Sequence, residues 1–104
     1  MAGTKRTDLP LTEGPILVER VQTGVRMEKR LLKVLKTLAE YYDITLGDLL
    51  EGIVLHVFDG KLPFEKPGIE RIHKLREFYG LDLRAEASHR LVEDAPRRRK
   101  GGAK

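Results

Sequence analysis

The sequence contains no cysteine and no tryptophan, and aromatic residues make up only 6% of its 104 residues. Without cysteine, neither a disulfide framework nor a thiolate metal site is available. No apolar run approaches the length of about 20 residues that crosses a bilayer, and the first residues lack the apolar core of a signal peptide. We therefore expect a soluble, cytoplasmic protein that does not enter a membrane.

Residues that support catalysis or metal binding are also sparse. The three histidines, His56, His73 and His89, lack the i, i+4 spacing and the carboxylate-rich setting of a metal site on a helix. Gly60-Lys61 is followed by leucine rather than Ser or Thr, so it does not match a phosphate-binding loop. We therefore predict a protein that is not an enzyme and that holds no metal and no cofactor.

Charge is unevenly distributed along the chain, whose formal net charge is +4. Residues 20–36 hold six Lys or Arg side chains and one acid, whereas residues 40–59 hold five acids and no Lys or Arg. Such a pattern is typical of a protein with a basic, phosphate-facing surface and an acidic surface elsewhere, or simply of solvated helix faces. Composition favours neither interpretation. Near the C-terminus there are four consecutive bases: Arg97, Arg98, Arg99 and Lys100.

An alternating pattern follows the N-terminal region. Residues 1–15 hold glycine and proline among polar residues and are predicted to form a mobile arm. From Arg20 to Met27, apolar and polar side chains alternate, which predicts a half-buried β-strand with one polar face. The polar face of this strand consists of Arg20, Gln22, Gly24 and Arg26.

After Met27 the apolar period lengthens to three or four residues, which predicts helices. A first helix is expected from near Glu28 to Tyr42. A second is expected from Thr45 to Phe58, because Thr45 and Asp48 have the spacing of a capping box. Within the second helix, Gly52 is predicted to permit a close contact with another helix.

The rest of the chain is predicted to be a helical extension over residues 61–94 and a disordered basic tail over residues 95–104. The extension should contain a third helix from about Gly68 to Tyr79, ended by Gly80, and a last short helix after Asp82.

A single strand cannot satisfy its own backbone hydrogen-bonding groups, and the pattern shows no second strand. Pairing with the same strand of a second copy across a two-fold axis would supply an antiparallel neighbour. We therefore expect a mainly helical homodimer with an intermolecular two-stranded ribbon. Such a ribbon fits the major groove of duplex DNA.

The segment 21–58, VQTGVRMEKRLLKVLKTLAEYYDITLGDLLEGIVLHVF, resembles the ribbon-helix-helix family of MetJ/Arc-like DNA-binding proteins. The resemblance rests on Arg26-Met27 at the end of the strand, LLKVLKTLAEYY, a short turn, Thr45 and an apolar helix. It implies an intertwined dimer built from residues 16–60, with duplex DNA as the ligand. The implied base-reading residues are Gln22, Gly24 and Arg26, and the implied phosphate-binding residues at the second helix are Thr45, Leu46 and Gly47.

The chemistry of these side chains agrees with two of the implied base contacts. An arginine such as Arg26 can bond bidentately to guanine, and a glutamine such as Gln22 to adenine. Arg20 and the four bases Arg97, Arg98, Arg99 and Lys100 would add attraction to phosphate regardless of sequence. The leading prediction is a homodimeric transcriptional regulator.

An alternative is a dimeric, antitoxin-like interaction module whose residues 61–94 bind a partner protein. Two features favour it over DNA binding. Gly24 has no side chain with which to read a base, and the carboxylates of Asp48 and Glu51 would oppose a phosphate at the second helix.

Overall fold

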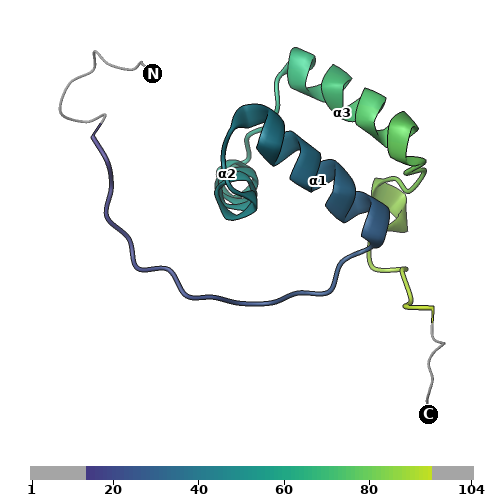
Figure 1. The fold of residues 1–104 in the computed structure, drawn as a ribbon, viewed down its shortest axis with the longest axis horizontal. Coiled ribbons are helices and arrows are strands. Elements are labelled where there is room, and N and C mark those ends of the chain that lie inside the picture. The colour runs from purple at the N-terminus through teal and green to yellow at the C-terminus, as the bar shows by residue number, and fades with distance from the viewer. Residues whose placement is uncertain (1–13, 95–104) are drawn as a thin grey trace, which may run out of the picture.

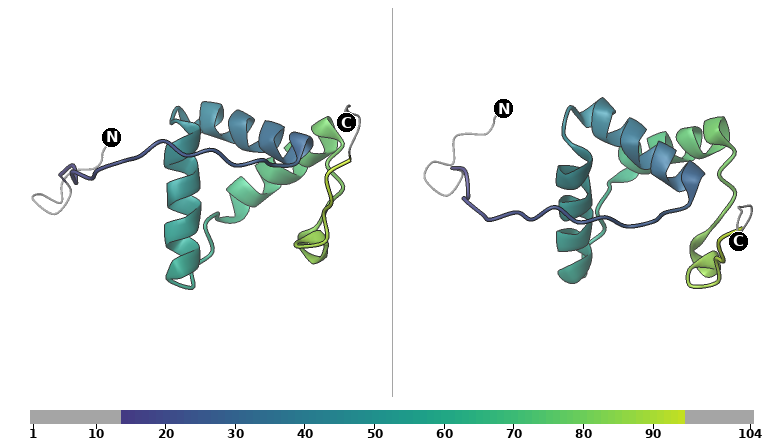
Figure 2. Two further views of the ribbon diagram at one scale, coloured as in Figure 1. Left: turned by 90° about the horizontal axis from the view of Figure 1, so that it is seen from below. Right: turned by 60° about the horizontal axis from the view of Figure 1, so that its bottom comes forward.

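The computed structural model describes residues 14–94, and these form three α-helices and one 3-10 turn (Figure 1). Helix α1 spans Lys29–Tyr42, α2 spans Leu46–Phe58 and α3 spans Lys66–Tyr79, and the 3-10 turn η2 spans Ala85–Ala87. Helix α1 contacts both α2 and α3. The three helices therefore share one small core centred on α1, and Figure 2 shows their arrangement from two further sides.

Helix α1 begins where the sequence predicted. The N-cap is Glu28, whose carboxylate accepts a hydrogen bond of 2.8 Å from the backbone N–H of Leu31. The helix ends at Asp43, which has a left-handed backbone with a φ of 60°. Aspartate tolerates this conformation better than most residues. The helix is thus fixed at both ends by local chemistry.

The predicted cap of the second helix is confirmed. Thr45 precedes α2, and its Oγ1 accepts a hydrogen bond of 3.0 Å from the N–H of Asp48. Helix α3 begins at Lys66, two residues before the expected Gly68, and carries proline in its first turn, where the missing N–H costs nothing. It ends at Gly80, whose φ of 69° suits glycine.

The core of the described residues is small. The buried hydrophobic side chains are Val34, Leu38, Ala39, Leu49 and Leu81. Phe64, Ile72 and Leu75 pack against them and are partly buried. A core of this size leaves much apolar surface exposed, including Leu55 and Phe58 of α2. None of the described helices is long and apolar enough to span a membrane.

The expected ribbon-helix-helix fold is wrong for the residues that the structure describes. That fold requires a two-stranded ribbon, whereas residues 14–94 contain helices and no β-strand. The segment 15–27, where the strand was predicted, runs as an extended chain beside the helices (Figure 1). Alternation determines which side chains of an extended chain share a face, but a strand also needs the backbone of a neighbour. Within the described part of the chain, no backbone hydrogen bond supplies that neighbour.

Two smaller predictions are also wrong. The region after Asp82 forms only the three-residue turn η2 instead of a last α-helix. A Cβ placed on Gly52 would meet no atom within 4 Å, so this glycine does not permit a close contact between described helices. The predicted arm lies, except for Gly14 and Pro15, outside the described residues. So does the predicted basic tail with Arg97, Arg98, Arg99 and Lys100.

Alanine at Gly68 should destabilise the protein by about 1 to 3 kcal/mol, because its Cβ would crowd the side chains of Phe64 and Tyr42. Gly68 is buried, and a Cβ there would lie 3.2 Å from Phe64 Cδ1 and 3.3 Å from Tyr42 Oη. Gly52→Ala is the matched control, because it adds the same atom to open space and should raise stability by up to about 1 kcal/mol. Urea unfolding of both variants measures the difference, and equal effects at the two positions would contradict this packing.

Candidate nucleic-acid interface

The extended segment 15–27 presents the residues predicted to read bases. Gln22, Gly24 and Arg26 occupy every second position, and all three are exposed. The side chain of Gln22 makes no hydrogen bond to any described residue, so its amide is free to bond elsewhere. Space around Gly24 is open as well, since a Cβ there would meet nothing within 4 Å. The segment is thus an accessible edge of the molecule that exposes both polar and apolar side chains.

Arg20 anchors this segment to α2. Its Nε lies 2.9 Å from Glu51 Oε2, and its terminal nitrogen lies 2.7 Å from Glu51 Oε1 and 3.1 Å from Asp48 Oδ1. The hydrogen bond with Glu51 and the charge of that carboxylate raise the pKa of Arg20. The same hydrogen bond lowers the pKa of Glu51 below its ordinary value. Arg20 therefore partly neutralises the negative charge of Asp48 and Glu51, the two acids near the predicted phosphate site. Its own guanidinium is occupied by these contacts.

Arg26 pairs with an acid that the sequence did not indicate. Its guanidinium makes two hydrogen bonds to the carboxylate of Glu93, one of them 2.9 Å from Nε to Oε1. The hydrogen bond with Glu93 raises the pKa of Arg26. Both side chains remain largely exposed, at 82% and 64%. No local spacing could have revealed this pair, because 67 positions separate its members.

The junction between the segment and α1 is held by Glu28 and Arg30. Arg30 bonds Glu28 Oε2 at 3.0 Å and the carbonyl oxygen of Gly80 at 2.7 Å, and it lies 3.4 Å from Asp82 Oδ1. Burial alone would raise the pKa of Glu28, but the hydrogen bonds from Leu31 and Arg30 outweigh burial and lower it. This network fixes the direction in which the segment leaves the helices.

The predicted phosphate site at the start of α2 retains free donors. Thr45 uses its hydroxyl as the cap, and the N–H groups of Leu46 and Gly47 donate to no described residue. Such N–H groups, with the helix dipole, favour an anion. The structure brings Arg20 to this end of α2, where it meets Asp48 and Glu51. Arg26 is instead joined to the C-terminal part of the described chain through Glu93.

Few other side chains in the described part of the chain are arranged for metal binding or catalysis. Over residues 14–94, no group of three or more His, Asp or Glu side chains is arranged to hold a metal ion. His56 bonds through Nδ1 to the carbonyl oxygen of Gly52 at 2.7 Å, one turn back along α2. This is a local contact of the helix and suggests no catalytic role.

Comparison with known proteins gives no match, whether with family models, with curated proteins or with solved structures. The resemblance to ribbon-helix-helix proteins consequently rests on the residues of segment 21–58 alone.

The contribution of Glu28 to stability should depend on pH. Its folded-state pKa is lowered, so the ionised cap stabilises the protein fully above the ordinary glutamate pKa. This stabilisation is lost as the pH falls through the lowered value. Glu28→Ala should therefore cost about 1 kcal/mol at neutral pH, and progressively less in acid. Urea unfolding of both proteins over a pH series measures the difference, and a loss independent of pH would contradict a charged cap.

Proposed function

We propose that the chain is a homodimeric DNA-binding protein that acts as a transcriptional regulator. One observation carries the proposal: an exposed, extended segment offers Gln22 and Arg26 on alternate positions and leads directly into a basic helix. An extended chain is narrow enough to enter a groove of duplex DNA, and the major groove displays the atoms that these two side chains bind. The proposed contacts are Arg26 with guanine and Gln22 with adenine.

The pairing of Arg26 with Glu93 does not prevent Arg26 from binding a base of DNA. Exposed ion pairs contribute little to stability, because water solvates the separated charges almost as well. Arg26 and Glu93 are both largely exposed, so DNA can replace the carboxylate at small cost. Guanine would then offer Arg26 two acceptors in the same bidentate geometry.

Phosphate contacts would come from α1 and α2. Lys29, Lys33 and Lys36 are exposed and spaced by four and three residues, so they lie along one side of α1. Lysine side chains attract the DNA backbone regardless of sequence. At α2, Arg20 compensates the charge of the neighbouring acids and thereby reduces their repulsion of a phosphate at Leu46 and Gly47.

The dimer is proposed from the outward face of α2. Leu55 is 64% exposed and Phe58 is 79% exposed, and Val54 and Val57 are exposed beside them. Leu49 on the opposite face of α2 is buried in the core. A helix that is apolar on both sides is typically covered on both sides. A second copy is the proposed cover, because an apolar patch around Leu55 and Phe58 is complementary to itself across a two-fold axis.

A second candidate function is the antitoxin-like interaction module. The observation that favours it is exposed apolar surface within residues 61–94, where Phe78 is 79% exposed and Leu62 is exposed as well. In this case a partner protein should bind in a fixed ratio, and binding should be lost in Phe78→Ser. Binding of a partner in a fixed ratio, together with no DNA motif enriched from random duplexes, would favour this candidate over the regulator.

The test of the proposed function is selection from a pool of random DNA duplexes at near-physiological salt. The full chain should enrich a short motif with two-fold symmetry. A variant with glutamine at positions 97–100 should enrich the same motif with lower affinity, because those bases would act only on phosphates. Failure of both proteins to enrich any motif would reject sequence-specific DNA binding.

The expectation of a cytoplasmic protein stays a prediction.

A further inference from the structure

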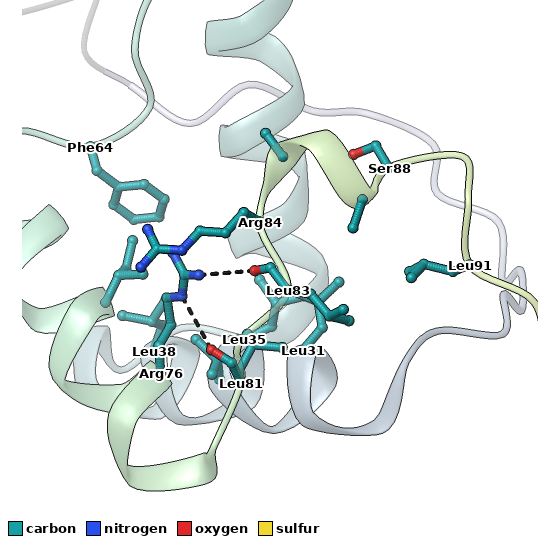
Figure 3. A pocket seen from close by; sticks show the side chains of 14 residues that line it. Leu31, Leu35, Leu38, Phe64, Arg76, Leu81, Leu83, Arg84, Ser88 and Leu91 are labelled. Atoms are coloured by element: carbon teal, nitrogen blue, oxygen red, sulfur yellow. Dashed lines mark hydrogen bonds between the residues drawn. The ribbon is translucent and has the colours of Figure 1, made fainter.

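A cavity of about 350 Å³ lies between α1, α3 and the chain that follows α3 (Figure 3). Its walls are mainly apolar: Leu31, Leu35 and Leu38 come from α1, and Leu83, Ala87 and Leu91 come from the C-terminal segment. The volume lies within the range of about 300 to 1,000 Å³ that is common for sites of small ligands. Apolar walls offer water few hydrogen bonds, so this space favours an apolar occupant.

The charged side chains that line the cavity are all positive. Arg76 and Arg84 both line it, and none of its lining residues is acidic. Arg76 is already committed, since it donates to the carbonyl oxygens of Leu81 at 3.5 Å and of Leu83 at 2.9 Å. The side chain of Arg84 makes no hydrogen bond or ion pair to any described residue, although its carbonyl oxygen accepts a hydrogen bond from the N–H of Ala87. Figure 3 shows its side chain reaching over the cavity toward Phe64.

We propose that this cavity binds a small molecule with an apolar body and one anionic group, such as a medium-chain carboxylate. The apolar body would lie against the leucines of α1 and of the C-terminal segment, and the carboxylate would accept hydrogen bonds from Arg84. A guanidinium offers two parallel donors to a carboxylate, which gives both affinity and orientation. Two neighbouring guanidinium groups would repel a cation at the same position. The lining of the site does not include Gln22, Arg26 or the start of α2, so the proposal does not rest on DNA binding.

Calorimetric titration of the full chain with decanoate, decanol and decylamine, each below its aggregation limit, tests the assignment. Decanoate should bind more tightly than decanol, and decylamine should bind least. Arg84→Gln should weaken decanoate about tenfold or more and leave decanol unchanged, because only the charged hydrogen bonds are lost. Arg90→Gln is the matched control, since Arg90 is an exposed arginine of the same segment outside the cavity lining. It should leave decanoate binding unchanged.

The position of the ligand is tested separately by amide chemical shifts of the wild-type protein, so no variant has to fold. Decanoate should shift the signals of Leu31, Ala85 and Ala87, which line the cavity. Shifts confined to Leu55 and Phe58 would show adsorption on the exposed face of α2 and overturn the proposal. Equal affinities for decanoate and decylamine, or no heat with any of the three probes, would overturn it too.

Discussion

Arg26→Ala should weaken binding to the selected DNA motif roughly tenfold to a hundredfold and relax the preference at one base pair in each half of the motif. The reason is geometric. Arg26 sits on the exposed extended segment, where its guanidinium already makes a two-point contact with the carboxylate of Glu93. The same two-point geometry matches the N7 and O6 atoms of guanine. Alanine removes both donors, and fluorescence anisotropy with the selected duplex measures the loss.

Arg26→Lys separates base reading from simple charge. Lysine keeps the positive charge but loses the planar pair of donors, so it should retain non-specific affinity and lose most of the base preference. Arg90→Ala is the control for loss of an exposed arginine, because Arg90 makes only a 3.5 Å hydrogen bond to the carbonyl oxygen of Glu86. An equal loss of affinity for every DNA sequence in Arg26→Ala would reduce Arg26 to a phosphate contact.

Glu93→Gln provides the complementary change. It removes a negative charge that competes with DNA for Arg26, so the affinity for the selected duplex should rise while the preferred motif stays the same. Removal of an acid also favours phosphate binding in general, so the gain supports a contact of Arg26 with DNA only if it disappears when Arg26 is alanine.

Replacing Leu55 and Phe58 together by serine should convert a dimer into a monomer at micromolar concentration. Both side chains are exposed on α2 in the isolated chain, so the change removes apolar surface without opening a cavity in the core. Hot-spot residues at the centre of an interface cost about 2 kcal/mol or more each when truncated, and a loss of about 2 kcal/mol corresponds to roughly a thirtyfold increase in Kd. Sedimentation velocity over a concentration series measures the shift.

Phe78→Ser is the matched control for this prediction. It removes an equally exposed aromatic side chain from α3, outside the proposed interface, and should leave the dimer intact. Circular dichroism establishes whether the double variant keeps its helices. A wild-type protein that stays monomeric at every concentration would disprove the dimer and assign the face of α2 to another partner.

The helices could be predicted from the sequence because their signals are local. The positions of Val34, Leu38 and Ala39 define the buried side of α1, and Thr45 with Asp48 marks the start of α2 within one turn. Gly80 marks the end of α3 by its left-handed backbone. Each of these features depends on residues within about four positions of one another, where backbone geometry fixes which groups can meet.

Features that depend on distant residues were missed or predicted wrongly. The alternation from Arg20 to Met27 was interpreted as a strand, although strand formation requires a second backbone that the pattern does not contain. The pair of Arg26 and Glu93 and the anchoring of Arg20 at α2 had no local signal either. The candidate residues of the site were therefore named from the sequence, but their partners were not.

By itself, the sequence determined the approximate extent of the three helices, the Thr45 cap, the end of α3 at Gly80 and the alternate spacing of Gln22, Gly24 and Arg26. Only the tertiary structure decided that the segment before α1 stays outside the helical core, that Arg20 and Arg26 take acidic partners, and that α1, α3 and the chain after α3 enclose an apolar cavity. The physical reason is the range of the interactions. Helical hydrogen bonds and caps join near neighbours, whereas ion pairs and cavity walls join residues that only the folded chain brings together.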